Sequence, residues 1–181
     1  MITKGISMFP QTIPTRFKMI KVGLLSDTHG SLPDNWMAFF EKCDEIWHAG
    51  DIGSLAIADT LSKYKFLRAV FGNIDGAEIR AEYPDIQVFE IEKLKVVMLH
   101  IGGYPGKYQP AAISLIRAHR PGLFVSGHSH ILKVIYDKTH KLLHINPGAA
   151  GKYGLHQKIT MLRFALEDGK IKNLEVFEKE R

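Results

Sequence analysis

The segment IKVGLLSDTHG, residues 20–30, decides the fold class of this chain. An apolar run rich in strand-forming residues ends here in the polar residues Asp27, Thr28 and His29. The same order, a short apolar run followed by Gly, Asp, Asn or His, recurs along the chain, with helical stretches between the runs. This alternation predicts an α/β fold.

The second half of the chain has a different pattern. Strands are predicted at residues 20–26, 44–49, 65–71, 86–91, 94–100 and 122–127, and then, where the helical periodicity stops, at residues 131–137, 141–146, 157–166 and 170–178. Helices are predicted at residues 34–43, 54–64 and 110–120, with Asp34 and Ser54 as N-caps and Pro110 in the first turn of the third. Because helices are few and strands many, we expect two β-sheets packed face to face with helices outside them.

The composition is typical of one globular domain. Of the 181 residues, 45% are hydrophobic and 24% are charged, a balance that excludes a disordered or collagen-like chain. Residues 1–18 contain two prolines and three of the positive charges, and we interpret them as an N-terminal extension to a domain of residues 19–181. Without them the net charge of +5 falls to +2, so the sequence carries no strong nucleic-acid signal.

Neither membrane insertion nor secretion is predicted. No apolar run is long enough to cross a bilayer, and the N-terminal residues lack the continuous apolar core of a signal peptide. The single cysteine, Cys43, has no second cysteine with which to form an internal disulfide or a Cys-based zinc site. We therefore expect a cytoplasmic location with no membrane partner, and we leave open whether the chain forms a homo-oligomer.

Polar residues that can bind metal ions follow five of the predicted strands. They are Asp27, His29, Asp51, Asn73, His100, His128 and His130. Since ligands bind at the carboxyl ends of the strands in α/β sheets, we expect these side chains to meet in one crevice. Asp27 and His29 lie two residues apart, as do His128 and His130, and in extended chain such pairs point the same way.

The set is larger than one ion can use. Carboxylate, amide and imidazole groups together suit Mn, Fe, Zn or Ni better than Mg or Ca alone. Two ions about 3.5–4 Å apart that share one carboxylate would use the whole set. The other histidines are assigned structural positions: His119 to a helix end, His140 to a turn, and His48, His144 and His156 to packing or to support of the ligands.

The order of the motifs resembles that of the calcineurin-like metallophosphoesterase superfamily, and within it the small single-domain bacterial and archaeal phosphodiesterases. The matching motifs are Asp27-x-His29, Gly50-Asp51, Gly72-Asn73, His100 and Gly127-His128-x-His130, followed by Asn146-Pro147-Gly148. The resemblance implies a four-layer αββα sandwich of two mixed β-sheets flanked by helices. It also implies two divalent metal ions bridged by Asp51, one held by Asp27, His29, Asp51 and His130, the other by Asp51, Asn73, His100 and His128.

The expected activity is hydrolysis of a small phosphodiester by a hydroxide bound to the two metal ions. We expect manganese, with Fe, Ni, Zn or Mg as alternatives, and assign the catalytic roles to Asp51, Asn73 and His100. Many phosphatases of the superfamily have a histidine directly after the Gly-Asn motif, whereas this chain has Ile74. Because that imidazole can protonate a leaving group, its absence favours phosphodiesters over phosphomonoesters.

Two other functions are left open. The retromer scaffold subunit is similar in fold to these enzymes but acts through protein contacts with a degraded metal site, so the fold alone does not decide. The complete set of ligand types favours an enzyme. A nuclease would use the same metals but would need a more basic surface than a charge of +2 suggests.

Overall fold

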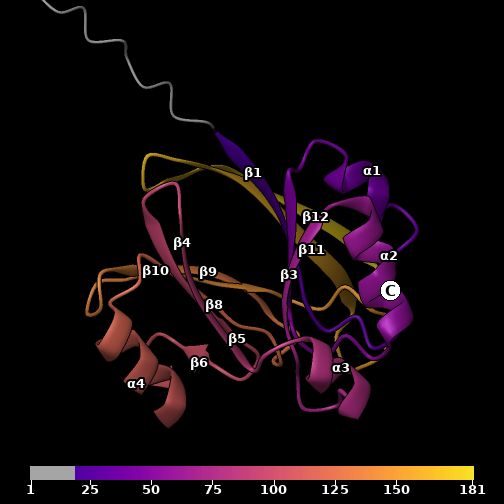
Figure 1. Cartoon of the computed structure of the whole chain (residues 1–181), viewed down its shortest axis with the longest axis horizontal. Helices are drawn as coiled ribbons and strands as arrows, with labels where there is room; N and C mark the ends of the chain where they lie inside the picture. Colours follow the sequence, from indigo (N-terminus) through magenta and orange to yellow (C-terminus); the bar gives the residue numbers. More distant parts are fainter. Residues whose placement is uncertain (1–18) are drawn as a thin grey trace, which may run out of the picture.

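The computed structural model describes residues 19–181 and contains two five-stranded β-sheets (Figure 1). The first sheet has the order β12 (Lys170–Glu180), β11 (Lys158–Glu167), β1 (Ile20–Leu25), β2 (Glu45–Ala49) and β3 (Phe66–Val70). The second has the order β4 (Ile86–Ile91), β5 (Leu94–Leu99), β8 (Leu123–Val125), β10 (Leu142–Pro147) and β9 (Leu132–Asp137). A two-stranded hairpin of β6 (Gly103–Tyr104) and β7 (Lys107–Tyr108) follows β5.

Both sheets are mixed. In the first, β1, β2 and β3 run parallel, while β11 is antiparallel to β1 and to β12. In the second, β5, β8 and β10 run parallel, while β4 and β9 are antiparallel edge strands. The parallel strands place their carboxyl ends at one edge of each sheet, which is where the polar loops begin.

Helices cover the outer face of each sheet. They are α1 (Trp36–Phe40), α2 (Leu55–Tyr64), α3 (Ala77–Glu82) and α4 (Pro110–His119). In Figure 1, α1, α2 and α3 lie beside the first sheet and α4 lies beside the second. The order of layers is therefore helix, sheet, sheet, helix, and the predicted αββα sandwich is confirmed.

The central strands β1, β2, β5 and β8 are apolar on both faces, and both faces are buried. Alternate residues of β1 divide between two cores: Val22 and Leu24 pack between the sheets, and Leu25 packs under α1 and α2. In β5, Val96 and Met98 likewise face the first sheet, while Val97 and Leu99 lie under α4. These continuous apolar runs are the reason that the strands could be recognised in the sequence.

The predicted strands are all present, within a few residues at their ends, and the helices predicted at residues 54–64 and 110–120 are confirmed as α2 and α4. The other helices differ from prediction. The first helix is shorter than residues 34–43, and its N-cap position is Asn35 rather than Asp34, without a side-chain cap hydrogen bond. Ser54 occupies the N-cap of α2 but also makes no such bond. Helix α3 was not predicted, because it has six residues and only Ile79 is buried, too little for a periodic signal.

The predicted N-terminal extension, residues 1–18, lies outside the described residues, so its separation from the domain stays a prediction. Within residues 19–181, no helix is long and apolar enough to span a bilayer.

Candidate metal centre

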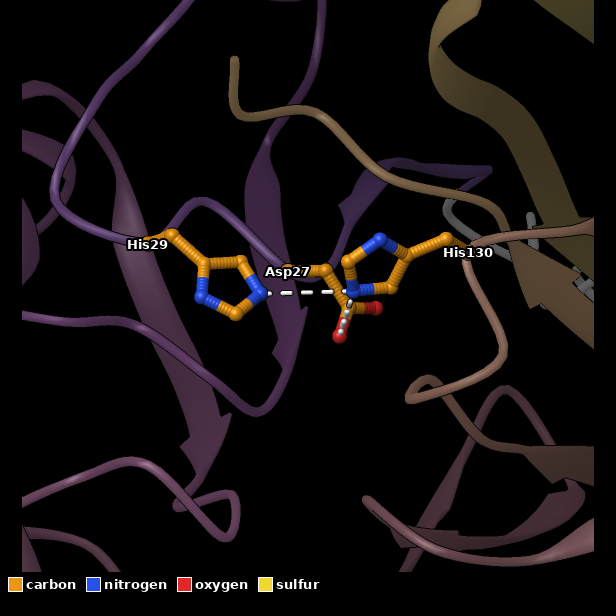
Figure 2. Close-up of side chains that lie close together, drawn as sticks. All are labelled: Asp27, His29 and His130. Atoms are coloured by element: carbon orange, nitrogen blue, oxygen red, sulfur yellow. Dashed lines mark hydrogen bonds and ion pairs between the residues drawn. The ribbon is translucent and has the colours of Figure 1, made fainter. Parts of the chain in front are cut away.

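Asp27, His29 and His130 form the first group of candidate metal ligands (Figure 2). Asp27 and His29 lie in the loop after β1, and His130 lies in the loop between β8 and β9. The Nε2 atom of His130 is 3.3 Å from Oδ1 of Asp27 and 3.3 Å from Nε2 of His29. One ion could therefore contact all three side chains.

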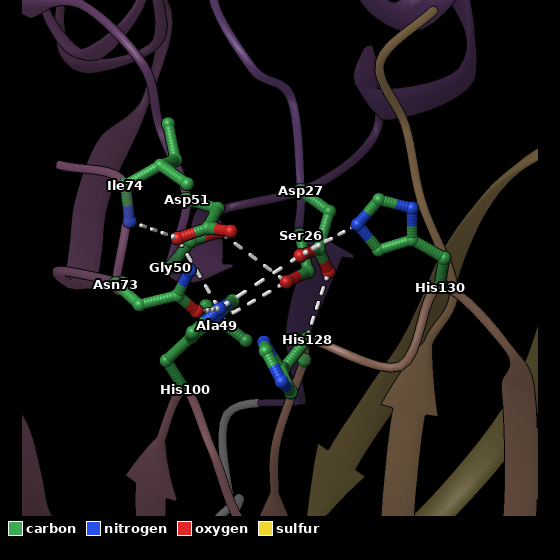
Figure 3. A network of polar contacts seen from close by, with 12 residues as sticks. Ser26, Asp27, Ala49, Gly50, Asp51, Asn73, Ile74, His100, His128 and His130 are labelled. Carbon is green, nitrogen blue, oxygen red and sulfur yellow. Dashed lines mark hydrogen bonds and ion pairs between the residues drawn. The ribbon is translucent and has the colours of Figure 1, made fainter. Parts of the chain in front are cut away.

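Asp51, His100 and His128 form the second group, and Asn73 lies beside it (Figure 3). The Nε2 atom of His100 is 3.2 Å from Oδ1 of Asp51 and 3.1 Å from Oδ1 of Asn73. These residues follow β2, β3, β5 and β8, so strand ends from both sheets supply the group. All seven residues singled out in the sequence thus meet at one edge of the sandwich.

Asp51 lies between the two groups. Its Oδ1 atom faces His100, and its Oδ2 atom is 3.7 Å from Nε2 of His29 in the other group. The backbone N–H of Ile74 donates a hydrogen bond of 3.1 Å to Oδ1 and helps to fix the carboxylate. This arrangement, with one oxygen directed at each group, is compatible with a carboxylate that bridges two ions.

The backbone at these residues is not extended, so the reasoning from extended chain was wrong. Asp27, His29, Asp51, His128 and His130 all have φ between 46° and 68°, in the left-handed region that residues other than glycine rarely adopt. Asp27 and His29 still lie in one group, whereas His130 joins the first group and His128 the second. That division agrees with the one implied by the family resemblance.

The electrostatics favour a charged Asp51. Burial opposes ionisation, but the hydrogen bond and positive charge of His100 outweigh it, so the pKa of Asp51 lies below its ordinary value. Burial likewise opposes protonation of His100, while Asp51 and Asp27 act in the other direction and raise the pKa of His100 above its ordinary value. Both shifts have the direction expected where buried carboxylates favour a positive charge beside them.

The arrangement of donors and acceptors fits a cation better than a proton. The carbonyl of Ala49 accepts a hydrogen bond of 2.8 Å from Nδ1 of His100, so the lone pair of a neutral His100 lies on Nε2 and faces carboxylate and amide oxygens. Asp27 is fully buried, and its Oδ1 atom has no hydrogen-bond partner. Because a buried carboxylate oxygen without a partner is costly, a metal ion is the group that best satisfies this site.

Glycines make room for the ligands. A Cβ atom on Gly72 would lie 2.0 Å from Oδ1 of Asp51, and one on Gly127 would lie 2.1 Å from Oγ of Ser26, beside Asp27. Gly50 has a φ of 93° and packs against the ring of His100. Of the glycines before Asp51, Asn73 and His128, only Gly50 is therefore required by backbone conformation; the other two are required by close contact.

The sequence profile of the calcineurin-like phosphoesterase superfamily domain matches residues 20–169. This chain belongs to that superfamily. Among curated proteins, a probable metallophosphoesterase of Methanothermobacter thermautotrophicus is 28% identical over 133 residues, covering 71% of this chain and 76% of the relative. A phosphodiesterase of Methanocaldococcus jannaschii is 25% identical over 150 residues, covering 74% and 86%.

Solved structures share the same fold. Vacuolar protein sorting 29 from Cryptosporidium parvum superposes with a TM-score of 0.64 over 90% of this chain and 99% of that chain, at 22% identity. At this level of identity the likeness establishes the architecture alone, and the chemistry has to be judged from the metal centre.

Asn73 is followed by Ile74 and Asp75 instead of a histidine, and both residues make hydrogen bonds that involve backbone N–H groups. Ile74 is half-exposed, and its N–H binds Asp51. The carboxylate of Asp75 accepts hydrogen bonds from the backbone N–H groups of Ile52, Gly53 and Gly72, at 3.1, 2.7 and 2.7 Å. Asp75 therefore holds the loops after β2 and β3 together and is not directed at the metal ligands.

The remaining histidines have different surroundings. His48 is buried, its Nε2 atom is 2.9 Å from Oγ1 of Thr28, and its Nδ1 atom accepts from the N–H of Gly50, so it supports two ligand loops. Burial lowers the pKa of His48 to about 4, which keeps it neutral at physiological pH. His144 stacks on Phe124 beneath α4 and packs in the core without contacting the ligands.

His156 contacts a metal ligand directly. Its Nδ1 atom is 3.1 Å from Nδ1 of His130, and its Nε2 atom is 3.0 Å from the carbonyl oxygen of Gly151. Because a carbonyl only accepts, Nε2 of a neutral His156 carries the proton and its Nδ1 accepts from His130. Burial lowers the pKa of His156, in keeping with this neutral form. Nε2 of His130 is then free to bind metal.

No spacing in the sequence marks His156 as a supporting residue. It lies 26 residues after His130 in an irregular loop, and it could only be placed among histidines with packing or supporting roles. Gly154, two residues before His156, also packs against His130: a Cβ atom at Gly154 would lie 2.4 Å from Nδ1 of His130. This contact is seen only in the structure.

We predict that Gly72→Ala weakens metal binding, because the added methyl group must displace the carboxylate of Asp51. Gly76→Ala is the matched control: nothing lies within 4 Å of its Cβ position, and its φ of −76° suits alanine. Titration of each purified protein with Mn²⁺ measures the effect. Equal Mn²⁺ affinity in the two variants would show that Asp51 does not depend on the space at Gly72.

We also predict that His156→Ala lowers the affinity for one of two bound ions by about 10-fold to 100-fold, the usual effect of losing a group that orients a metal-binding histidine. His156→Gln should restore part of the affinity, since its amide oxygen can accept from His130. His119→Ala, at the end of α4, serves as the control. Calorimetric titration with Mn²⁺ resolves the two sites, and unchanged affinity in His156→Ala would contradict the assignment.

Proposed function

We propose that this protein is a metal-dependent phosphodiesterase that uses two divalent ions. The observation that carries the proposal is the position of Asp51, whose two carboxylate oxygens face two separate groups of ligands. The superfamily membership and the phosphodiesterase among the relatives support the same reading. The chemistry of the donors, with imidazole and carboxylate in both groups, suits manganese, with Fe, Ni, Zn or Mg as alternatives.

Each ion would be held by four side chains, with Asp51 common to both. Asp27, His29, Asp51 and His130 would hold the first, and Asp51, Asn73, His100 and His128 the second. When bound, such a pair of ions lowers the pKa of a shared water and polarises the phosphoryl oxygens for in-line attack. The substrate would be a phosphodiester, since Ile74 replaces the imidazole that could protonate a poor leaving group.

The surrounding residues hold the candidate ligands in place through hydrogen bonds. Ala49 orients His100 through its carbonyl, and the backbone N–H of His128 donates a hydrogen bond of 3.1 Å to Oδ2 of Asp27. Preorganised groups of this kind cost no rearrangement during the reaction. We assign Asp51, Asn73 and His100 the closest contact with the reacting phosphate.

The scaffold function, in which the same fold acts through protein contacts, is the main alternative. A scaffold has no need for a buried carboxylate oxygen without a hydrogen-bond partner, such as Oδ1 of Asp27 here. A nuclease would use the same ions, so it is separated from a small-molecule diesterase by testing oligonucleotides alongside small diesters.

We predict that the protein purified without chelator and supplied with excess Mn²⁺ binds two ions per chain, and that Asp51→Asn loses both the second ion and activity. Asparagine keeps the shape of the side chain but removes the charge and one anionic oxygen. The expected loss in kcat/KM is more than about 100-fold, which exceeds the usual loss when a residue that only hydrogen-bonds to a metal ligand is replaced. Asp34→Asn, on the exposed surface, is the control.

The measurements are elemental analysis and hydrolysis of bis(para-nitrophenyl) phosphate. Normal activity of Asp51→Asn at saturating Mn²⁺ would remove the bridging role. Complete absence of metal-dependent hydrolysis in the unmodified protein would favour the scaffold.

We further predict a higher kcat/KM for bis(para-nitrophenyl) phosphate than for para-nitrophenyl phosphate. A phosphomonoester has an additional negative charge and gains more from an acid beside the leaving group, which Ile74 does not provide. The two substrates share their leaving group, so their ratio at equal Mn²⁺ concentration tests the substrate class. A preference for the monoester would mean that another residue supplies the proton.

A further inference from the structure

A pocket of about 880 Å³ opens directly beside the metal centre. His128, His130 and the neighbouring residues up to the start of β9 form one side of it, and residues of the loop after β10 and of strands β11 and β12 form the rest. In Figure 3 the side chains of these two histidines border the ligand network from the side of the second sheet. Its volume is within the range of pockets that bind small organic molecules.

Two large apolar side chains are exposed at this pocket. Ile131 directly follows the ligand His130 and is 56% exposed, and Leu155 is fully exposed. A single exposed apolar residue is ordinary, but two in one concavity next to a polar metal centre make a surface that loses water favourably when an apolar group covers it. The metal centre and the apolar surface are therefore adjacent parts of one depression.

The charges in the pocket cancel. Lys158 at the start of β11 and Glu178 on β12 form an ion pair of 2.5 Å. These are the two fully charged side chains among the described residues that line the pocket, apart from histidine. The nearby Arg181 donates a hydrogen bond from its guanidinium group to the carbonyl of Gly154, which lines the pocket. A second phosphate or a carboxylate would have to compete with these partners for Lys158 and Arg181, whereas an uncharged group leaves them in place.

We propose that this pocket binds one ester arm of the substrate, and that the arm is uncharged and aromatic or branched apolar. The proposal rests on the diesterase function and narrows it. His128 and His130 belong to the two candidate metal groups and also line the pocket, so a substrate arm that extends from the phosphate past these histidines would enter it. The substrate class is thus a phosphodiester with a single phosphate group and at least one bulky uncharged arm.

Binding of diesters that are not hydrolysed on the time scale of the measurement tests the pocket separately from catalysis. Diphenyl phosphate and dimethyl phosphate have the same charge and differ only in their arms. We expect calorimetric titration of the Mn²⁺-loaded protein to show binding of diphenyl phosphate at least about tenfold tighter than of dimethyl phosphate. Diphenyl phosphate with a carboxylate on one ring should bind more weakly than diphenyl phosphate itself. Tighter binding of the carboxylate compound would contradict the proposal that the arm is uncharged.

Variants place the preference in this pocket. Leu155→Ser and Ile131→Ser should each reduce the ratio of the two affinities by about threefold. Ile135→Ser on β9, an exposed apolar residue outside the pocket, is the matched control and should leave the ratio unchanged. The Mn²⁺ content of every variant is measured, so that a disturbed His130 is recognised.

Equal affinity for the two diesters, or the same ratio in pocket and control variants, would overturn the proposal. Hydrolysis of bis(para-nitrophenyl) phosphate is followed in parallel. If hydrolysis is absent while diphenyl phosphate still binds through Leu155 and Ile131, the diesterase function fails and the pocket stands. If hydrolysis is present but diphenyl phosphate and dimethyl phosphate bind equally well, the diesterase function stands and the pocket proposal fails.

Discussion

The rest of the structure depends on two buried carboxylates, Asp27 and Asp51, at the edge where the two sheets meet. Removing a carboxylate from water costs several kcal/mol, and that cost is recovered only by opposite charge and well-placed donors. Each carboxylate accepts a backbone hydrogen bond, Asp27 from His128 and Asp51 from Ile74. The other neighbouring groups are imidazole nitrogens and the Asn73 amide oxygen, and Oδ1 of Asp27 has no hydrogen-bond partner. The site is therefore stabilised most by cations, and the surrounding fold holds negative charge in place for them.

The fold maintains this arrangement at a cost in backbone conformation. Several ligands adopt left-handed φ angles, which persist only where the neighbouring structure determines them. The loops are tied to one another at short range: the N–H of Asp27 donates to Gly50 at 2.9 Å, and the N–H of Gly127 donates to His100 at 2.9 Å. Because the strands beneath these loops are buried on both faces, their ends cannot shift independently.

One loop connects the metal centre with the adjacent pocket. Gly151 and His156 form the hydrogen-bonded chain that ends at His130, while Leu155, in the same loop, lines the apolar depression. A movement of this loop would therefore alter both the orientation of one metal ligand and the surface offered to a substrate arm. This shared loop is the physical reason to expect metal binding and substrate preference to be coupled.

The sequence by itself determined the α/β class, the ten main strands and the seven candidate ligand residues, because buried strands are continuously apolar and polar groups begin where they end. It did not determine α3, whose single buried residue leaves no periodic pattern, nor the left-handed backbone of five candidate ligands, nor the division of His128 and His130 between two groups. The contact of His156 with His130 and the neutral pocket beside them were decided by tertiary structure alone. They join segments that only the packing of two sheets brings together, and no local spacing encodes that proximity.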